Sequence, residues 1–219
     1  MFLKKVSKNL NQTFTVGKNI VSGEYPSFVY RNILNENEIP VFCLHSATPG
    51  SFETMLRYLK ENGYHTLSID EFYQILINKK EKKTGRSILL TFDDGMGSVW
   101  SIAYPLLKKY GFKATVFLVP GRIKYRNKYY PNLEDVWVGT ANMQEVLERD
   151  HSDQPFSTWE EVKTMHESGA FDFESHTFDH SLIFTSPEIV DFVNPAILSR
   201  YHLFEFPRIR CGEKEGQAQ

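Results

Sequence analysis

The chain contains the stretch Ser87-Ile-Leu-Leu-Thr-Phe-Asp-Asp-Gly95, in which an apolar run leads directly into two acidic residues and a glycine. The run has the length of a buried strand, and it predicts one at residues 87–92. Gly95 allows the backbone conformations that a tight turn requires, so both carboxylates can turn toward one site. The stretch therefore predicts a buried strand that is followed by a pair of acidic side chains.

Further strand-like and helix-like segments alternate on both sides of this stretch. Strands are expected at residues 41–44, 64–67, 114–119 and 171–175. Between them, apolar residues recur at helical spacing, as in Phe52, Met55, Leu56 and Leu59. Repeated strand-helix-strand units imply parallel strands that are joined by right-handed crossovers. The sequence therefore predicts an α/β fold, either a barrel or a doubly wound sheet.

The expected helix ends carry recognisable signals. Two stretches have the pattern of a capping box, Ser68-Ile-Asp-Glu71 and Ser157-Thr-Trp-Glu160. Glycines stand where helix C-caps are expected, at Gly63, Gly111 and Gly169. Pro105 is expected either to kink its helix or to occupy the first turn.

Length and composition fit one globular domain, or one domain with an insertion, since 41% of the 219 residues are hydrophobic. Residues 1–39 lack clear periodicity and are interpreted as an N-terminal arm. Residues 40–210 are expected to form the domain, which an insertion at about 120–156 interrupts with glycine, proline and many polar residues. Residues 211–219 form a polar tail.

Reactive side chains follow several of the predicted strands. His45 follows the first strand, Asp93 and Asp94 follow the third, and His176 and His180 follow the last. Because active sites gather at the carboxyl ends of parallel strands, these side chains are expected to converge. Two imidazoles and one carboxylate are a common ligand set for catalytic zinc. In such a site one aspartate binds the metal and its neighbour accepts a proton from the activated water.

Each of these signals also has an ordinary structural reading. An Asp-Asp-Gly sequence often forms only a strand-ending turn, and a lone pair of histidines often caps or packs. His45 is compatible with a contact to the substrate or to a ligand, or with a hydrogen-bonded core histidine. The other histidines before residue 176 are not accompanied by further candidate site residues, and they are expected in structural or surface roles: His65, His151 and His166.

Two motifs carry a family resemblance. Thr91-Phe-Asp-Asp-Gly95 and Ser175-His-Thr-Phe-Asp-His180 resemble the first two motifs of the NodB-homology polysaccharide deacetylases, carbohydrate esterase family four. Three further stretches are similar to that family in the same order, Tyr104-Pro-Leu-Leu-Lys-Lys-Tyr-Gly111, Ala114-Thr-Val-Phe-Leu118 and Trp159-Glu-Glu-Val162. The resemblance covers roughly residues 41–180.

The resemblance implies a role for each matching residue. Asp93 corresponds to the catalytic base, whereas Asp94, His176 and His180 correspond to the ligands of a divalent metal, with zinc as the usual ion. It also implies a distorted (β/α) barrel of the NodB-homology type and an N-acetylated carbohydrate substrate.

The chain departs from the family after His180. The family's third motif contains an Arg and a Pro, and its later motifs contribute a tryptophan-lined pocket and a histidine general acid. Phe204-Glu-Phe-Pro-Arg208 offers Pro207 and Arg208 as substrate-binding or supporting residues, but in a different order, and the setting of His202 does not match the general acid. The barrel is therefore expected to be incomplete at its C-terminus. Such a chain is expected to be a weak hydrolase with an unpaired sheet edge that favours self-association.

Composition limits the partners and the location of the protein. The 25 basic and 27 acidic residues give a net charge of −2, which argues against nucleic acid as a partner. No apolar segment is long enough to span a membrane. The basic N-terminus lacks the apolar core of a signal peptide, so a cytoplasmic location is expected. Cys43, in an apolar run, is expected in the core, and Cys211 is expected to be an incidental thiol.

Three functional hypotheses follow. The first is a metal-dependent hydrolase that removes acetyl groups from N-acetylated sugars, either polysaccharides or smaller glycan precursors, by metal-activated water. The second is a hydrolase of another non-peptide carbon-nitrogen bond. The third is an inactive sugar-binding domain that still carries the metal.

Overall fold

The computed structural model describes residues 13–22, 38–78, 85–123 and 127–180. The chain divides into two units, Met1–Glu38 and Ile39–Gln219. In the first unit the described residues form a helix over residues 13–21. None of the helices in the described ranges is long and apolar enough to cross a membrane.

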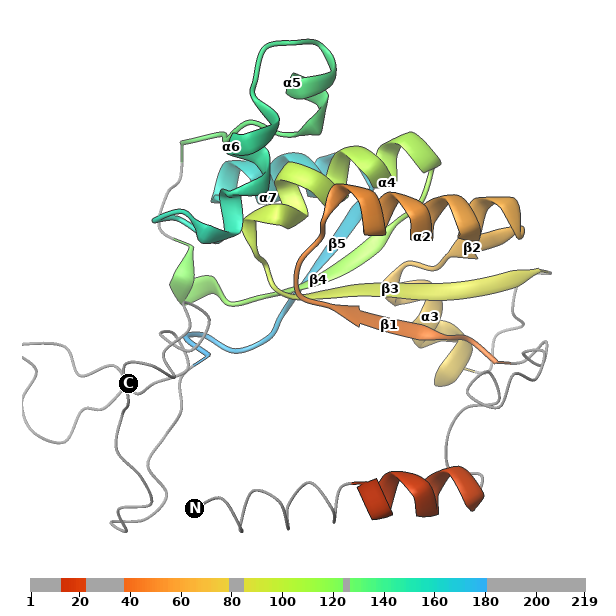
Figure 1. The fold of residues 1–219 in the computed structure, drawn as a ribbon. Helices are drawn as coiled ribbons and strands as arrows, with labels where there is room; N and C mark the ends of the chain where they lie inside the picture. Colours follow the sequence, from red (N-terminus) through yellow and green to blue (C-terminus); the bar gives the residue numbers. More distant parts are fainter. Residues whose placement is uncertain (1–12, 23–37, 79–84, 124–126, 181–219) are drawn as a thin grey trace, which may run out of the picture. The chain divides into compact units, whose positions relative to one another are not determined.

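A parallel β-sheet is the centre of the second unit (Figure 1). Its strands are β1 (Val41–Leu44), β2 (Tyr64–Thr66), β3 (Arg86–Asp94), β4 (Ala114–Leu118) and β5 (Phe171–Ser175). The order is β1-β3-β4-β5, and β2 pairs with the first residues of β3. The predicted α/β class is therefore confirmed. Within the described part of the chain the strands form an open sheet that does not close into a barrel.

Strand β3 runs two residues further than the sequence predicts. Its side chains are almost all buried, as expected for a central strand of a parallel sheet that is covered on both faces. Asp93 and Asp94 are its last residues, because they pair in register with Phe117 and Leu118 of β4. The expectation that both aspartates follow the strand is therefore wrong. They lie at its carboxyl end.

Three helices cover one face of the sheet, as Figure 1 shows: α2 (Pro49–Glu61), α4 (Tyr104–Tyr110) and α7 (Trp159–Glu167). Helix α3 (Ile69–Leu76) follows β2 and lies near β5, where the Ile69 N–H donates to Asp172 Oδ2 over 3.1 Å. A π-helical turn, η2 (Val99–Ala103), leads directly into α4. The chain therefore alternates between strands and covering helices, as predicted.

The helix ends agree with the sequence signals in most cases. Ser68 and Glu71 form the predicted capping box of α3, and Pro105 occupies the first turn of α4. Gly111 ends α4 in the left-handed conformation, with φ 72°. The capping box of α7 is one residue later than predicted, because Thr158 is the N-cap and Glu161 completes the box.

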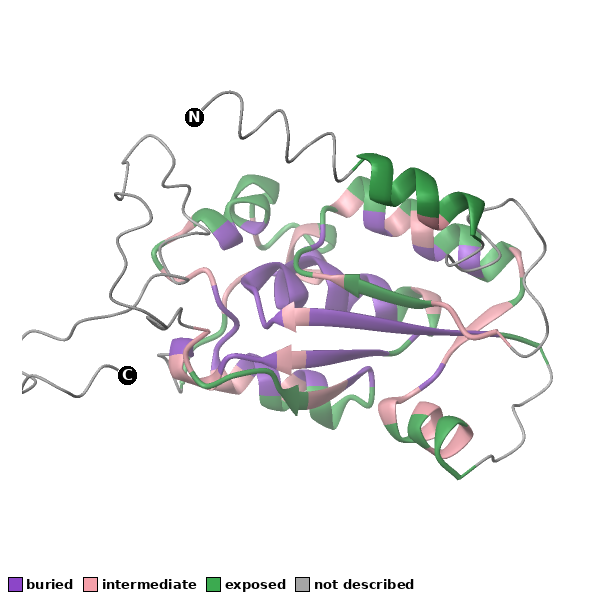
Figure 2. Ribbon diagram, turned by 90° about the horizontal axis from the view of Figure 1, so that it is seen from below, coloured by how far each residue is buried: buried purple, intermediate pink, exposed green. Residues whose placement is uncertain are grey.

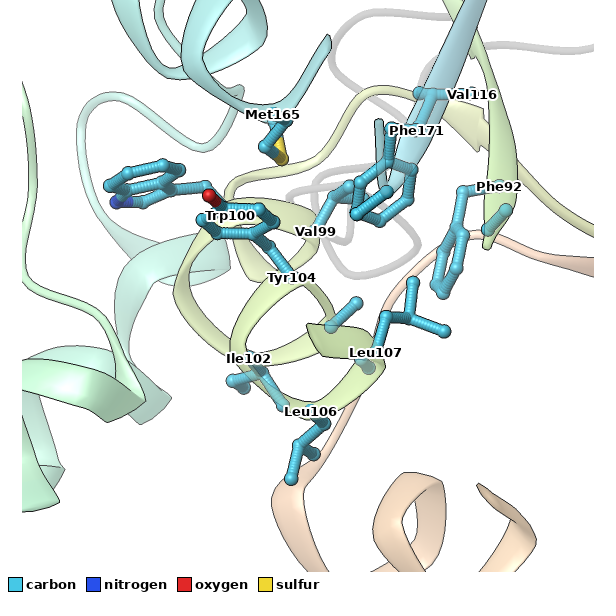
Figure 3. Close-up of a cluster of buried hydrophobic side chains, with 14 of the residues drawn as sticks. Phe92, Val99, Trp100, Ile102, Tyr104, Leu106, Leu107, Val116, Met165 and Phe171 are labelled. Atoms are coloured by element: carbon cyan, nitrogen blue, oxygen red, sulfur yellow. The ribbon is translucent and has the colours of Figure 1, made fainter. Parts of the chain in front are cut away.

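Aliphatic side chains and several aromatic rings fill the core between the helices and the sheet (Figure 3). The Phe92 ring lies at the centre, with ring centroids 5.6 Å from Phe52 and 6.2 Å from Phe171 in edge-to-face geometry. Trp100 stacks on Tyr104 at 5.3 Å beside them. Removing one such buried ring typically costs about 3–5 kcal/mol of stability. The core therefore fixes β3, which carries the two aspartates.

The described residues between 120 and 156 form four short helical turns, η3 (Pro120–Arg122), α5 (Leu133–Trp137), α6 (Met143–Leu147) and η4 (Arg149–His151). Asp150 Oδ1 accepts from the Ser98 N–H at 2.6 Å, and the Gly97 N–H donates to the Pro155 carbonyl at 2.6 Å. These bonds hold the loop that follows Asp94 against the end of this segment. The assignment of residues 120–156 as an insertion stays a prediction.

Strand β1 is largely exposed, whereas β3 and β4 are buried (Figure 2). The prediction that Cys43 belongs to the core is therefore wrong, since Cys43 is exposed. Strand β1 pairs with β3 along its length, and of its four residues only Leu44 is partly buried against the core.

Candidate functional site

The structure brings Asp94, His176 and His180 together at the carboxyl ends of β3 and β5. One ligand-type atom from each residue lies within 4.8 Å of the other two. Asp94 Oδ1 is 3.9 Å from His176 Nε2 and 3.7 Å from His180 Nε2. The two imidazole rings are 5.2 Å apart between centroids. Residues that are far apart in the sequence therefore form one compact cluster, and it is the one that the strand-end rule predicts.

A tight turn aims Asp94 at the histidines. Asp94 has φ 68°, and the Gly95 N–H donates to the Asp93 carbonyl at 2.9 Å across it. Three-residue turns with positive φ at the centre are rare and strained. Aspartate tolerates this backbone region better than most residues do, and strain of this kind gathers at functional sites. The Asp94 carboxylate at the end of β3 therefore does not follow the regular alternation of side chains between the two faces of the strand.

The histidines lie in a loop that extends from β5, residues 176–180. The loop begins where the His176 N–H donates to the Leu118 carbonyl at 2.8 Å, which continues the pairing of β5 with β4. Its last described residue is His180, whose φ is 50° and whose N–H donates to Thr177 Oγ1 at 2.9 Å within the loop. The bond to Leu118 therefore joins the loop to the sheet, and the bond to Thr177 folds the loop back so that both rings lie near Asp94.

The donor set fits a divalent metal. Asp94 Oδ1 is buried and accepts no hydrogen bond from any described residue, and its side chain is only 8% exposed. A buried acceptor without a hydrogen bond is costly unless an ion or another partner compensates it. Two atoms that each lie about 2.0–2.2 Å from one zinc ion are at most about 4.4 Å apart. Both separations from Asp94 to the imidazole nitrogens satisfy that limit.

Asp93 lies beside this cluster but belongs to different contacts. Its side chain is 21% exposed, so it is more accessible than that of Asp94. The thiol of Cys43 donates to Asp93 Oδ2 over 3.2 Å, and His45 Nε2 lies 4.0 Å from the same oxygen. Although Cys43 as a residue is exposed, desolvation of its thiol beside Asp93 raises the pKa of the thiol, and the hydrogen bond with Asp93 raises it further. A protonated thiol remains a donor, so it helps to orient the carboxylate of Asp93.

The other predicted site residues have different outcomes. His45 follows β1 and its side chain is 64% exposed, so the reading of His45 as a core histidine is wrong. Pro207, Arg208 and His202 lie outside the described residues. Sequence reasoning missed Cys43, which was taken as a core residue. The available signal was its position two residues before His45, since alternate residues of a strand share a face.

Gly95 tests how tightly the turn is built. Gly95 has φ 73°, and an added Cβ would lie 2.6 Å from Leu118 Cδ2. We expect Gly95→Ala to destabilise the fold by about 1–3 kcal/mol through its backbone conformation alone, and further through this contact. Gly139→Ala is the matched control, because Gly139 has φ 80° and nothing within 4 Å of its Cβ position. Urea unfolding of both variants measures the difference, and equal losses would show that the contact with Leu118 has no cost.

Comparisons with known proteins agree on one family. Residues 80–192 match the family described as polysaccharide deacetylase. The chain is 30% identical over 139 residues to poly-beta-1,6-N-acetyl-D-glucosamine N-deacetylase of Staphylococcus aureus, covering 63% of this chain and 39% of that protein. It is 29% identical over 151 residues to YxkH of Bacillus subtilis, a provisionally assigned polysaccharide deacetylase, covering 65% of this chain and 43% of that protein. The chain thus spans about two fifths of the length of these curated relatives.

A solved structure is also similar. IcaB from Ammonifex degensii matches with a TM-score of 0.48 and 24% sequence identity, over 65% of this chain and 55% of that one.

Proposed function

Since the chain belongs to the polysaccharide deacetylase family, we propose that it hydrolyses the acetamide group of an N-acetylated sugar. The observation that carries the proposal is the buried Asp94 carboxylate, which faces His176 and His180 while Asp93 stands beside it with a more exposed carboxylate. This difference in exposure supports a division of roles in which Asp94 binds the metal and Asp93 is the acid that the substrate reaches. Because the chain spans only part of its curated relatives, the activity is a proposal for this chain.

We assign the metal ligands as Asp94, His176 and His180, with zinc as the ion. Two imidazoles and one carboxylate are a common protein ligand set for catalytic zinc, and they leave a position open. When bound there, zinc supplies Lewis-acid polarisation of a carbonyl and lowers the pKa of water toward neutrality. Asp94 Oδ1 supports this assignment, because it is buried without a hydrogen bond from any described residue and a bound cation would offset the cost of that burial.

Asp93 is assigned as the general base. It accepts a proton from the attacking water while the new carbon-oxygen bond forms at the acetyl carbonyl. The carbon-nitrogen bond then breaks as the proton held by Asp93 passes to the leaving nitrogen. This leaves the free amine on the sugar and releases acetic acid, which ionises to acetate. In this proposal Cys43 orients the Asp93 carboxylate through its hydrogen bond, and the exposed His45 ring beside Asp93 is a substrate contact. Pro207 and Arg208 stay sequence predictions as further substrate contacts.

The proposed substrate is a polymer of N-acetylglucosamine rather than a small glycan precursor. The support is the Staphylococcus aureus relative, a poly-beta-1,6-N-acetyl-D-glucosamine N-deacetylase, whose substrate is a beta-1,6-linked polymer of this sugar.

We expect the zinc-loaded protein to release acetate from beta-1,6-linked oligomers of N-acetylglucosamine, in amounts matched by new free amines. Beta-1,4-linked oligomers of equal length test the linkage preference, and the Asp93→Asn variant supplies the background. Binding of the oligomers without acetate release above that background would favour the inactive sugar-binding hypothesis. Release of a product other than acetate from a wider amide panel would favour hydrolysis of another carbon-nitrogen bond.

A further inference from the structure

A buried arginine lies next to the loop that carries the two histidines. Arg122 is the last residue of η3, the turn that follows β4, and only 3% of it is exposed. Its Nε donates to the backbone carbonyl of Asp179 over 2.8 Å. A buried guanidinium is costly unless its donors are used, because a charge is removed from water. Nη1 of Arg122 has no hydrogen-bond acceptor within the described residues, so the Nε bond to Asp179 is a contact on which the buried side chain depends. The acceptor belongs to the residue directly before His180.

The same turn contacts the loop at a second point. The Gly121 N–H donates to the Phe178 carbonyl over 2.8 Å. A Cβ at Gly121 would lie 2.6 Å from that carbonyl oxygen and would also collide with Asp179 Oδ1. Only a glycine therefore permits this close approach. Consecutive carbonyls of the loop, at Phe178 and Asp179, are both held by η3.

Strand β4 provides the common reference for the whole cluster. Leu118 pairs with Asp94 on β3 and with Ser175 on β5, and its carbonyl accepts from His176 N–H. Turn η3 begins two residues after Leu118. The sheet thus fixes η3 relative to Asp94. The contacts of η3 with the Phe178 and Asp179 carbonyls in turn fix this part of the histidine loop relative to Asp94.

We propose that Arg122 is a positioning residue that holds the histidine loop so that both imidazoles face Asp94. The inference rests on the proposed metal site and extends it to a residue that contacts no substrate. Without the Arg122 bond, the Asp179 carbonyl loses its donor and His180, with its left-handed backbone, loses the adjacent constraint. Groups that orient metal ligands typically contribute about 10-fold to 100-fold in metal affinity.

The direction of the change in zinc affinity distinguishes a positioning role of Arg122 from an effect of its positive charge alone. Arg122→Met keeps much of the aliphatic stem but removes a positive charge. Through charge alone, that removal would strengthen the binding of a divalent cation, since like charges repel. Through positioning, it weakens binding by about 10-fold to 100-fold.

The test is a titration of the metal-free protein with zinc in competition with a chelator, together with the visible spectrum of the cobalt(II) form. We expect Arg122→Met to bind zinc about 10-fold to 100-fold more weakly and to alter the cobalt spectrum, which reports ligand geometry. Gly121→Ala is the second variant, because it displaces the same loop while it keeps the Arg122 charge. It is expected to weaken zinc binding in the same direction.

Arg86→Met is the matched control. Arg86 is exposed at the start of β3, at the opposite end from the aspartates, and its Nη1 donates to the Asn62 carbonyl at 3.4 Å. The zinc affinity of the Arg86→Met variant should equal that of the unchanged protein.

If the unchanged protein binds no zinc, the proposed function fails. If it binds zinc and a folded Arg122→Met binds equally or more tightly, the positioning role is wrong. If Arg122→Met does not fold, undiminished zinc binding by Gly121→Ala overturns the proposal.

Discussion

The His176→Ala variant is expected to lose zinc, with an affinity at least about 100-fold below that of the unchanged protein. Loss of an orienting partner alone typically costs about 10-fold to 100-fold in metal affinity, so loss of a direct ligand should cost more. His176 Nε2 lies 3.9 Å from Asp94 Oδ1, and its removal leaves one imidazole and one carboxylate in the cluster. Two ligands are too few for the proposed zinc site.

Thermal unfolding provides a second readout of the same loss. Zinc at about 100 times its dissociation constant stabilises a protein by about 2.7 kcal/mol. At the same zinc concentration, a 100-fold weaker site gives only about 0.4 kcal/mol. The zinc-dependent rise in the unfolding midpoint should therefore nearly vanish in His176→Ala, and likewise in His180→Ala.

His166→Ala is the control for the loss of an imidazole. His166 is exposed on α7, outside the cluster, and packs edge-on against Phe173 at 6.3 Å between ring centroids. Its zinc content and its zinc-dependent stabilisation should match those of the unchanged protein. Undiminished zinc in His176→Ala and His180→Ala, measured by elemental analysis, would show that the ligands are misassigned.

The sequence was sufficient to predict the alternating strands and the convergence of the site residues, because the signals for both lie within short segments of the chain. Apolar runs of strand length and glycines at helix ends report on their own segments, and parallel strands bring their carboxyl ends to one edge. Asp93, Asp94, His176 and His180 could be placed at those ends without knowledge of any long-range contact. The end of β3 was harder to predict, because acidic residues are poor strand formers and only pairing with β4 extends the strand through Asp94.

Other features depend on contacts that a local pattern does not report. Residues 157–161 contain two overlapping capping patterns, and the structure uses the later one. Ser157 is occupied elsewhere, since its N–H donates to the Gly95 carbonyl at 2.9 Å and its hydroxyl donates to the Met96 carbonyl at 3.1 Å. The exposure of Cys43 likewise follows from the position of β1 in the sheet. Arg122 gave no sequence signal, because its acceptor lies 57 residues away.

The same substitution at the two adjacent aspartates is expected to lower activity in both variants but to remove zinc from only one of them. Asp93→Asn should keep zinc while kcat falls by about 100-fold to 10,000-fold, the usual contribution of general acid-base catalysis. Asp94→Asn should lose zinc and activity together, because the amide removes the negative charge from the buried cluster. The burial of the side chains supports the division, with 21% exposure for Asp93 and 8% for Asp94.

The substitution of aspartate by asparagine is nearly isosteric, so the comparison isolates charge and basicity from shape. Zinc content by elemental analysis and acetate release under saturating substrate are measured on the same preparations of both variants. The activity lost in Asp93→Asn should not return with added zinc, because its site is already filled. In Asp94→Asn, excess zinc should restore part of the activity if the base is intact. Equal zinc loss in both variants would show either that the pair is assigned in the wrong order or that both carboxylates bind the ion.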